Sequence, residues 1–292
     1  MKDYTINGKV YGTSLNNTHI GSVAMLLYNS ALISKYDLDN PYQLWKKGKW
    51  TWSKFIDICE DFKKLSGAEF ACGGNGWTIW AELYGVPGPV GYDGTKYFNN
   101  TGNSKFIQIT QEIADLYNTS RLFGYWKSDE FNKGDCLFWA GASVYARRKN
   151  SYFSSLKSAG TLSVVPFPAI DGQSKYYQAL DEYEAYGIAK GAKNPKAVPY
   201  FLRYFLDAEN YDLAAFFCNT QALEVYNWCM KQQNRIWSTY YEINAQFHGS
   251  TPDSFKEIRD LTGAQIPNFL KSQSSVIDAR VDKFNQALKQ LK

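Results

Sequence analysis

Histidine and cysteine are scarce in this sequence, and their scarcity excludes several kinds of catalytic and metal site. Two of the 292 residues are histidines, His19 and His248, and five are cysteines. The cysteines show no C-x-x-C pair and no zinc-ligand spacing, and their odd number argues against a disulfide framework. We expect most of them to be small buried hydrophobes, with free thiols at Cys218 and Cys229 rather than a bridge.

Sequence motifs of the common enzyme classes are also missing. The chain contains no G-x-S-x-G, H-E-x-x-H, P-loop or G-x-G-x-x-G, and two histidines leave few members for a triad or a metal site. The neighbouring acids Asp181, Glu182 and Glu184 leave a glycoside hydrolase as a rival hypothesis, although acids clustered on one strand seldom face each other across a glycosidic bond. We therefore expect no enzyme, no cofactor and no metal.

Neither a basic stripe nor a long apolar run is present. Lys and Arg number 32 against 28 Asp and Glu, which gives a net charge of +4, and the basic residues are scattered. Nucleic acid is therefore not the expected partner. No window is long and apolar enough for a membrane span, and the opening MKDYTINGKVYG lacks the apolar core of a signal peptide. As written, the sequence carries no export signal.

Aromatic residues, by contrast, are abundant: 22 Tyr, 18 Phe and 9 Trp form 17% of the chain. Large rings suit surfaces that bind something flat and partly apolar. A tyrosine-rich core explains the total equally well, so the local clusters carry more weight than the total.

Two tryptophans flank Thr51 in the stretch GKWTWSKF, residues 48–55. Thr51 is a typical N-cap, and Trp52 begins an apolar stripe that continues at positions 55, 56, 59 and 62, which is helical spacing. Trp50 precedes the cap, where a hydrophobic staple would lie, while Lys54 replaces the glutamate of a capping box. We expect both tryptophans to pack in the fold rather than to contact a ligand.

Strands and helices alternate along the rest of the chain, which predicts an α/β fold. SVAMLLYN and TLSVVPFP are typical of buried strands and GYDGTKYFNN of a hairpin, and residues 106–117 and 277–291 carry helical apolar faces. A further helix is predicted from Asn194 as its cap and Pro195 as its first residue, with a kink at Pro199.

Six blocks then occur in a familiar order: NGKVYG, LLYNSAL, W..GKWTWSKF, FNKGDCLFW, VVPFP and YGIAKGAKNPKAVPYFLRYFL. In this order and spacing the sequence resembles the extracellular solute-binding proteins of carbohydrate ABC importers, the maltose-binding-protein-like group. The resemblance runs from about residue 7 to the C-terminus. Each block alone is a weak signal, but six in order are fairly specific.

The resemblance implies a periplasmic-binding-protein-like fold of type II, with two α/β lobes joined by hinge strands. It implies a sugar or oligosaccharide held in the cleft between the lobes without chemical change, and a monomer that delivers it to the permease subunits of an ABC importer. It also implies an extracellular location, with attachment to the cell surface by a lipid anchor that this sequence does not contain.

The chain departs from the family at its start. Relatives place most of the first lobe before the NGKVYG strand, whereas Met1 here lies almost on that strand, so we expect an incomplete first lobe. Residues 15–182 and 241–292 would form the second lobe, and residues 1–14 and 187–240 a hinge strand and the remnant of the first. A truncated member that acts as a protein-interaction module is the alternative function.

Sugars require aromatic platforms for their C–H faces and planar polar side chains for their hydroxyls. The loop GGNGWTIW offers both, because Asn75 can bond hydroxyls and Trp77 can stack. By position these two resemble ligand contacts of the maltose-binding relative, with Asn75 in place of an acid. LFWAGASVY offers Trp139 or Tyr145 where relatives stack a tryptophan, with the register open by one or two residues. Packing within the fold is the alternative for each ring.

Two further segments supply polar candidates. In NNTHIGS, Ser22 aligns with an acidic contact of relatives, and Asn17 or His19 can reach the ligand instead. In DEYEAYG, Asp181 and Tyr183 share one face of a strand because side chains alternate along it. Solvated residues of a turn and of a strand edge are the alternative interpretations.

Overall fold

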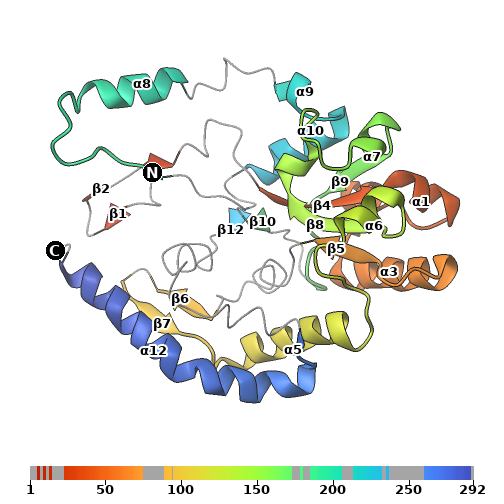
Figure 1. The fold of residues 1–292 in the computed structure, drawn as a ribbon, viewed down its shortest axis with the longest axis horizontal. Helices are drawn as coiled ribbons and strands as arrows, with labels where there is room; N and C mark the ends of the chain where they lie inside the picture. Colours follow the sequence, from red (N-terminus) through yellow and green to blue (C-terminus); the bar gives the residue numbers. More distant parts are fainter. Residues whose placement is uncertain are drawn as a thin grey trace.

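A four-stranded mixed sheet carries the main core (Figure 1). β4 is antiparallel to both β8 and β9, and β5 is parallel to β8. The order across the sheet is β5 (Cys72–Gly74), β8 (Phe138–Ala142), β4 (Ala24–Asn29) and β9 (Leu162–Val165). This computed structural model describes residues 5–6, 9–10, 13–14, 23–74, 89–93, 95–172, 178–179, 185–205, 213–231, 235–236 and 260–290.

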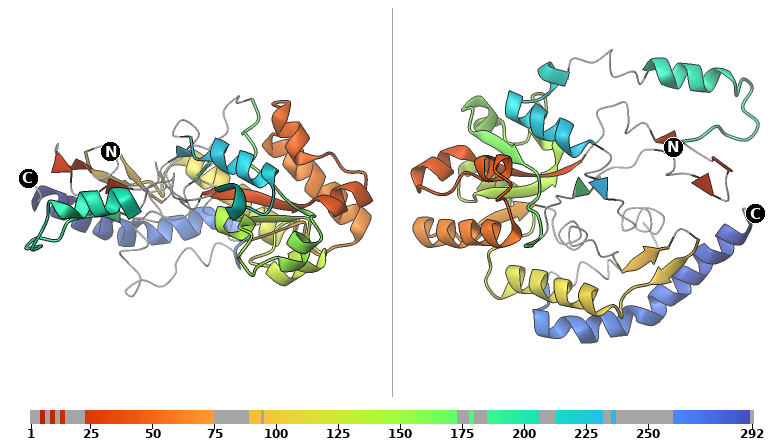
Figure 2. Two further views of the ribbon diagram at one scale, coloured as in Figure 1. Left: turned by 90° about the horizontal axis from the view of Figure 1, so that it is seen from above. Right: turned by 180° about the vertical axis from the view of Figure 1, so that it is seen from behind.

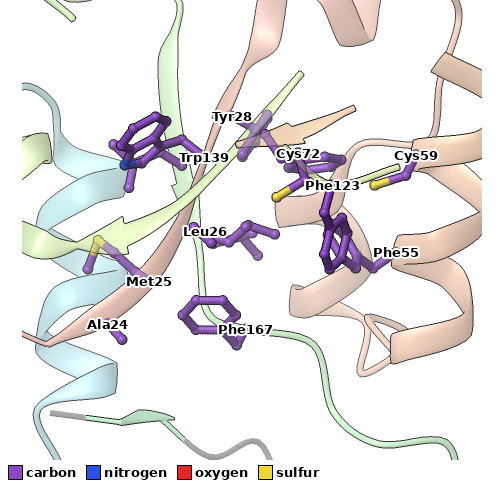
Figure 3. Packing of buried hydrophobic residues seen from close by; sticks show 14 of the residues in the cluster. Ala24, Met25, Leu26, Tyr28, Phe55, Cys59, Cys72, Phe123, Trp139 and Phe167 are labelled. Carbon is purple, nitrogen blue, oxygen red and sulfur yellow. The ribbon is translucent and has the colours of Figure 1, made fainter. Parts of the chain in front are cut away.

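Both predicted buried strands are confirmed in this sheet. All residues of β4 and β9 are buried, as expected of strands covered on both faces. Side chains of β8 alternate between the faces: Phe138 packs on Phe55 of α3 (Trp52–Ser66), with ring centroids 5.1 Å apart, whereas Trp139 packs on the other side. Figure 3 shows Phe55 and Cys59 on the α3 side of the strands, away from Trp139.

The start of α3 is built as the sequence predicts. Thr51 accepts a hydrogen bond from the Lys54 N–H at 3.4 Å and caps the helix. Trp50 is fully buried and lies edge-on to Phe55, at a centroid distance of 5.9 Å, which is the predicted staple. Its indole N–H donates to the Pro166 carbonyl at 2.8 Å and so ties the start of α3 to the chain that follows β9.

Asp171 adds a second cap to α3. It accepts hydrogen bonds from the Ser53 N–H at 3.0 Å and the Ser53 hydroxyl at 2.6 Å. Partial burial raises the pKa of Asp171, but the bonds from Ser53 outweigh it and hold the pKa below its ordinary value.

Because the ionised form is favoured in the folded state, Asp171 contributes stability above its unfolded pKa of about 3.9 and loses it as the pH falls through the lowered pKa. We expect Asp171→Asn to lower the free energy of unfolding by about 0.5 kcal/mol at neutral pH, a value reduced by solvent screening. Urea denaturation of both proteins between pH 3 and 7 measures this. A difference in the free energy of unfolding that is as large at pH 3 as at pH 7 would contradict this prediction.

The helix α10 (Thr220–Cys229) packs on the edge strand β9 and on α2 (Pro41–Lys46). The Asn219 side chain caps α10 and donates to the Leu162 carbonyl at 2.9 Å. Trp228 meets Trp45 of α2 edge-on, with ring centroids 5.5 Å apart. The boundary that assigns residues 187–240 to the first lobe stays a prediction, and α10 is the part of that range that packs on the four-stranded sheet.

A second group of elements lies below the sheet in the view of Figure 1, where α12 runs along α5 and the β6–β7 hairpin, as Figure 2 also shows. Asn285 fastens α12 to the hairpin, because it accepts from the Tyr97 N–H at 2.8 Å and donates to the Tyr97 carbonyl at 2.9 Å. The predicted hairpin is thus confirmed, and α12 begins earlier than its apolar pattern predicted. The bounds are β6 (Val90–Tyr92), β7 (Tyr97–Asn99), α5 (Ser104–Asn118) and α12 (Ile266–Gln290).

The helix α8 (Ala197–Phe205) begins later than predicted. The Ala197 N–H donates to the Asn194 carbonyl at 3.2 Å, so Asn194 and Pro195 belong to a turn before the helix. Pro199 then lies in the first turn, where the N–H groups have no partner within the helix, and the predicted kink at Pro199 is unnecessary.

Short elements complete the described chain. They are β1 (Thr5–Ile6), β2 (Lys9–Val10), β3 (Thr13–Ser14), α1 (Ser30–Lys35), α6 (Ser128–Lys133), η1 (Ser143–Ala146), α7 (Ser154–Ser158), β10 (Gln178–Ala179), β11 (Ala185–Tyr186), α9 (Leu213–Phe216), β12 (Arg235–Ile236) and η5 (Gly263–Gln265).

The cysteines are free, as predicted, and four of the five are buried. Burial raises the pKa of the Cys136 thiol to about 12 and that of Cys72 well above its ordinary value. A thiol that stays protonated at neutral pH is a poor nucleophile. These two cysteines therefore serve as core residues.

Candidate functional site

Segments that carry predicted ligand contacts leave the sheet at one edge. β5 and β8 are parallel, with Gly74 opposite Ala140. β4 runs the other way, so that its first residue, Ala24, lies opposite Ala142. The carboxyl ends of β5 and β8 therefore meet the amino end of β4. We call this the loop edge of the sheet and define it by Gly74, Ala142 and Val23.

Two hydrogen bonds from backbone N–H groups hold the loop edge together. The Ser143 N–H donates to the Val23 carbonyl at 2.8 Å, and the Val23 N–H donates to the Ser143 hydroxyl at 3.2 Å. Asn75 directly follows Gly74 in the chain, and Ser22 directly precedes Val23. Two of the predicted contacts, Asn75 and Ser22, are therefore the chain neighbours of residues that define the loop edge.

The other predicted segments are anchored by short strand pairs. β3 pairs antiparallel with β11, and β10 pairs parallel with β12 and lies against β4. In the sequence, residues 15–22 link β3 to β4, and residues 180–184 link β10 to β11. Seven predicted contacts lie outside the described residues and stay predictions: Asn17, His19, Ser22, Asn75, Trp77, Asp181 and Tyr183.

Trp139 is one of two predicted contacts that the structure describes, and it has no exposed surface. Its Nε1 lies 2.6 Å from where a Cβ would stand on Gly141, so the indole covers the backbone of its own strand. This conformation offers no open face for stacking, and a sugar contact by Trp139 stays a prediction that packing disfavours. The rings around it, here called the aromatic cluster, are Trp126, Phe131, Tyr145 and Phe153, at centroid distances of 5.1–6.2 Å.

Tyr145 is the other described candidate, and it is placed better for a ligand. It lies in η1, directly after β8, and is partly exposed. Tyr152 meets its ring edge-on at 5.3 Å. Lys157 fixes the segment that carries Tyr152, because its ammonium donates to the carbonyls of Asn150 at 2.8 Å and Tyr152 at 2.7 Å. Burial lowers the pKa of Lys157 to about 8.

Trp126 also lies at this edge, and the sequence did not single it out. It is partly exposed, just before α6, and belongs to the aromatic cluster. Its backbone bonds to Gly74 in both directions, with its N–H donating at 3.2 Å and its carbonyl accepting at 2.9 Å. No periodicity marks Trp126, and the one signal in the sequence is an aromatic pair, Tyr125 and Trp126, directly after Gly124.

Aromatic rings packed close to glycine backbone dominate the described part of the loop edge. Among the described residues, no three His, Cys, Asp or Glu side chains gather in a way that could hold a metal ion. In the same part of the chain, no helix has both the length and the apolar character to cross a bilayer. Rings over glycine backbone suit the binding of a flat, partly apolar ligand.

Two hollows in the described surface lie away from the predicted contacts. The larger, about 820 Å³, opens between α2 and α10 beside Trp45 and Trp228. The smaller, about 540 Å³, lies near the end of α5 beside Tyr117 and Tyr125. Neither is lined by a predicted contact residue, so these two hollows are separate from the loop edge.

Solved structures resemble this chain over almost its whole length. A cyclic alpha-maltosyl-1,6-maltose binding protein from Arthrobacter globiformis matches with a TM-score of 0.68 and 14% identity, over 96% of this chain and 74% of that one. The sugar-binding protein MalE from Xanthomonas citri matches with a TM-score of 0.69 and 11% identity, over 98% and 74%. The galacto-N-biose/lacto-N-biose I-binding protein of the ABC transporter from Bifidobacterium longum matches with a TM-score of 0.61 and 14% identity, over 96% and 73%.

These likenesses establish the fold. No model of a known protein family matches the sequence, and no curated protein matches it. At identities of 11–14% the structural matches show that this chain has the α/β, periplasmic-binding-protein-like fold that the sequence predicts. The fold prediction is therefore confirmed, whereas a ligand does not follow from the fold alone.

Proposed function

We propose that this chain, which has the fold of sugar-binding proteins, binds a sugar or oligosaccharide at the loop edge without transforming it. One observation carries the proposal. The strand ends that adjoin Asn75 and Ser22 in the chain lie at the same edge of the sheet as the partly exposed rings of Tyr145 and Trp126. Aromatic faces for C–H groups, with polar loops around them, are the chemistry that a saccharide requires.

The proposal extends to the biological role. We infer delivery of the sugar to the permease subunits of an ABC importer by a monomer outside the cell, held at the surface by a lipid anchor. The Bifidobacterium structure that shares this fold belongs to an ABC transporter, which supports the inference. In this proposal, residues 15–182 form the second lobe together with α10 and α12. The short N-terminal strands and α8 belong to the first lobe.

A calorimetric and thermal-shift screen of oligosaccharides tests the function. A ligand that binds only the folded state stabilises the protein by about 2.7 kcal/mol when its concentration is a hundred times Kd. It must therefore raise the melting temperature. Unchanged ligand recovered from the complex supports a binder. Released product would instead support the glycoside hydrolase alternative.

Trp77→Ala is expected to weaken binding of the best sugar by about 1 to 3 kcal/mol with the fold intact, because one stacked ring is lost. Isothermal titration of the variant and the parent measures the difference. Trp45→Ala, in the hollow beside α10, is a control that should leave the affinity unchanged. An unaltered affinity in Trp77→Ala would remove Trp77 from the site.

A protein-interaction module is the second candidate, and α8 is the feature that favours it. Tyr200, Phe201 and Tyr204 on this helix are 77%, 62% and 78% exposed. Exposed rings gathered on one helix often mark a protein contact. If no sugar shifts the melting temperature, this alternative becomes the preferred function.

A further inference from the structure

Trp126 has a backbone that few bulky residues adopt. Its φ is +63° and that of the next residue, Lys127, is +47°. Left-handed conformations at consecutive non-glycine residues are uncommon, and for a large side chain they are outliers. Such strain persists where the surrounding structure enforces it, and it concentrates at functional sites.

The enforcing contacts come from β5. Trp126 exchanges two backbone hydrogen bonds with Gly74, the last residue of that strand. The approach is close, because a Cβ on Gly73 would lie 2.9 Å from the Trp126 carbonyl oxygen. The backbone that carries the Trp126 indole is therefore held beside Gly74, the residue that precedes Asn75 in the chain.

The neighbouring rings shape a wall around this position. Trp126 meets Trp139 at 5.2 Å and 76°, and Tyr145 at 6.5 Å and 79°. Both contacts are edge-to-face, so neither neighbour stacks flat on the Trp126 ring, which is partly exposed. Trp126 is thus a rigid ring with surface left over, next to the predicted ligand contacts.

A buried donor in the same cluster has no acceptor in the part of the chain that the structure describes. The Nε1 of Trp139 is buried, and it has no hydrogen-bond partner among the described residues. It lies over Gly141, on the side that Tyr145 also covers. A buried N–H without an acceptor is costly, so an acceptor brought by a ligand or its bound water would be favoured here.

We propose that Trp126 is a ligand-contacting residue of the saccharide site: the ring on which the C–H face of a pyranose unit stacks, with Tyr145 as the adjoining wall. The inference rests on the proposed sugar-binding function and names a specificity-determining residue within it. The strain at residues 126 and 127 is the means by which the fold aims this ring at the ligand.

The test compares three substitutions against the best oligosaccharide from the screen. Trp126→Leu, which keeps an apolar side chain but loses the flat ring face, should weaken binding roughly 10- to 100-fold in calorimetry. Trp126→Phe should retain most of the affinity. Trp228→Leu, a matched control at another partly buried tryptophan with an edge-on partner, should bind as the parent does.

A fluorine NMR measurement keeps the test decisive if Trp126→Leu folds poorly. In the parent protein labelled with fluorotryptophan, the resonance that vanishes in Trp126→Phe should shift when the oligosaccharide is added. A parent that binds a sugar, with Trp126→Leu equally tight or this resonance unmoved, overturns the inference and leaves the function standing. A parent that binds no saccharide overturns both.

Discussion

Replacing Trp50 by alanine is expected to lower the free energy of unfolding by about 3 to 5 kcal/mol, the range for deleting a large aromatic side chain from a core. The indole is fully buried and packs edge-on against Phe55 and at 6.3 Å from Phe138. Its loss also leaves the Pro166 carbonyl without the N–H that it accepts at 2.8 Å. A cavity and an unpaired acceptor thus act together at the start of α3.

Trp52→Ala is the matched control, two residues along the chain. Trp52 is partly exposed and contacts Phe55 and Phe123 at centroid distances of 5.7 and 6.3 Å. We expect a loss of about 1 to 2 kcal/mol, typical of a partly buried substitution. Urea denaturation followed by circular dichroism measures both variants. Equal losses would show that the staple and the Pro166 bond add nothing to ordinary packing.

The start of α3 shows what the sequence can predict in this fold. The cap, the staple and the apolar stripe lie within thirteen residues, so local rules determine them without knowledge of the tertiary structure. The same holds for β4 and β9, where runs of apolar residues can only be covered on both faces. The order of such local units, rather than any one of them, carried the resemblance that predicted the fold.

The placement of α10 could not be predicted in the same way. Its contacts join Asn219 to Leu162 and Trp228 to Trp45, pairs that are far apart in the chain. Nothing local in the sequence indicates which lobe such a helix joins. Once the sheet exists, the open edge of β9 and the indole of Trp45 offer the partners.

The candidate site, too, contains residues that the sequence could predict and others that depend on tertiary contacts. The sequence left both Trp139 and Tyr145 as candidates, because the register of this segment against its relatives was open by one or two residues. The pairing of β8 with β4 decides the face of Trp139, which points into the aromatic cluster, whereas Tyr145 follows the strand and reaches the surface. Trp126 escaped notice because its position depends on bonds to Gly74 and on a strained backbone, neither of which a residue pattern encodes.

Gly74→Ala is expected to be among the most damaging small substitutions in the chain, with a loss of about 2 to 5 kcal/mol. A Cβ at this position would lie 2.0 Å from the Ala140 carbonyl oxygen and 2.7 Å from its nitrogen. Because those atoms are backbone of the neighbouring strand, the sheet itself must shift, at a cost of about 1 to 3 kcal/mol. The φ of +106° adds roughly 1 to 2 kcal/mol for any residue with a Cβ.

Gly102→Ala is the control, since a Cβ there meets nothing within 4 Å. It should leave stability unchanged or raise it by about 0.4 to 1 kcal/mol through the unfolded chain. Gly74 also ends β5 at the residue that fixes Trp126 and begins the Asn75 segment. Any Gly74→Ala protein that still folds should therefore bind the oligosaccharide more weakly than Gly102→Ala does. Unaltered affinity together with lowered stability would mean that the ligand does not depend on the loop edge.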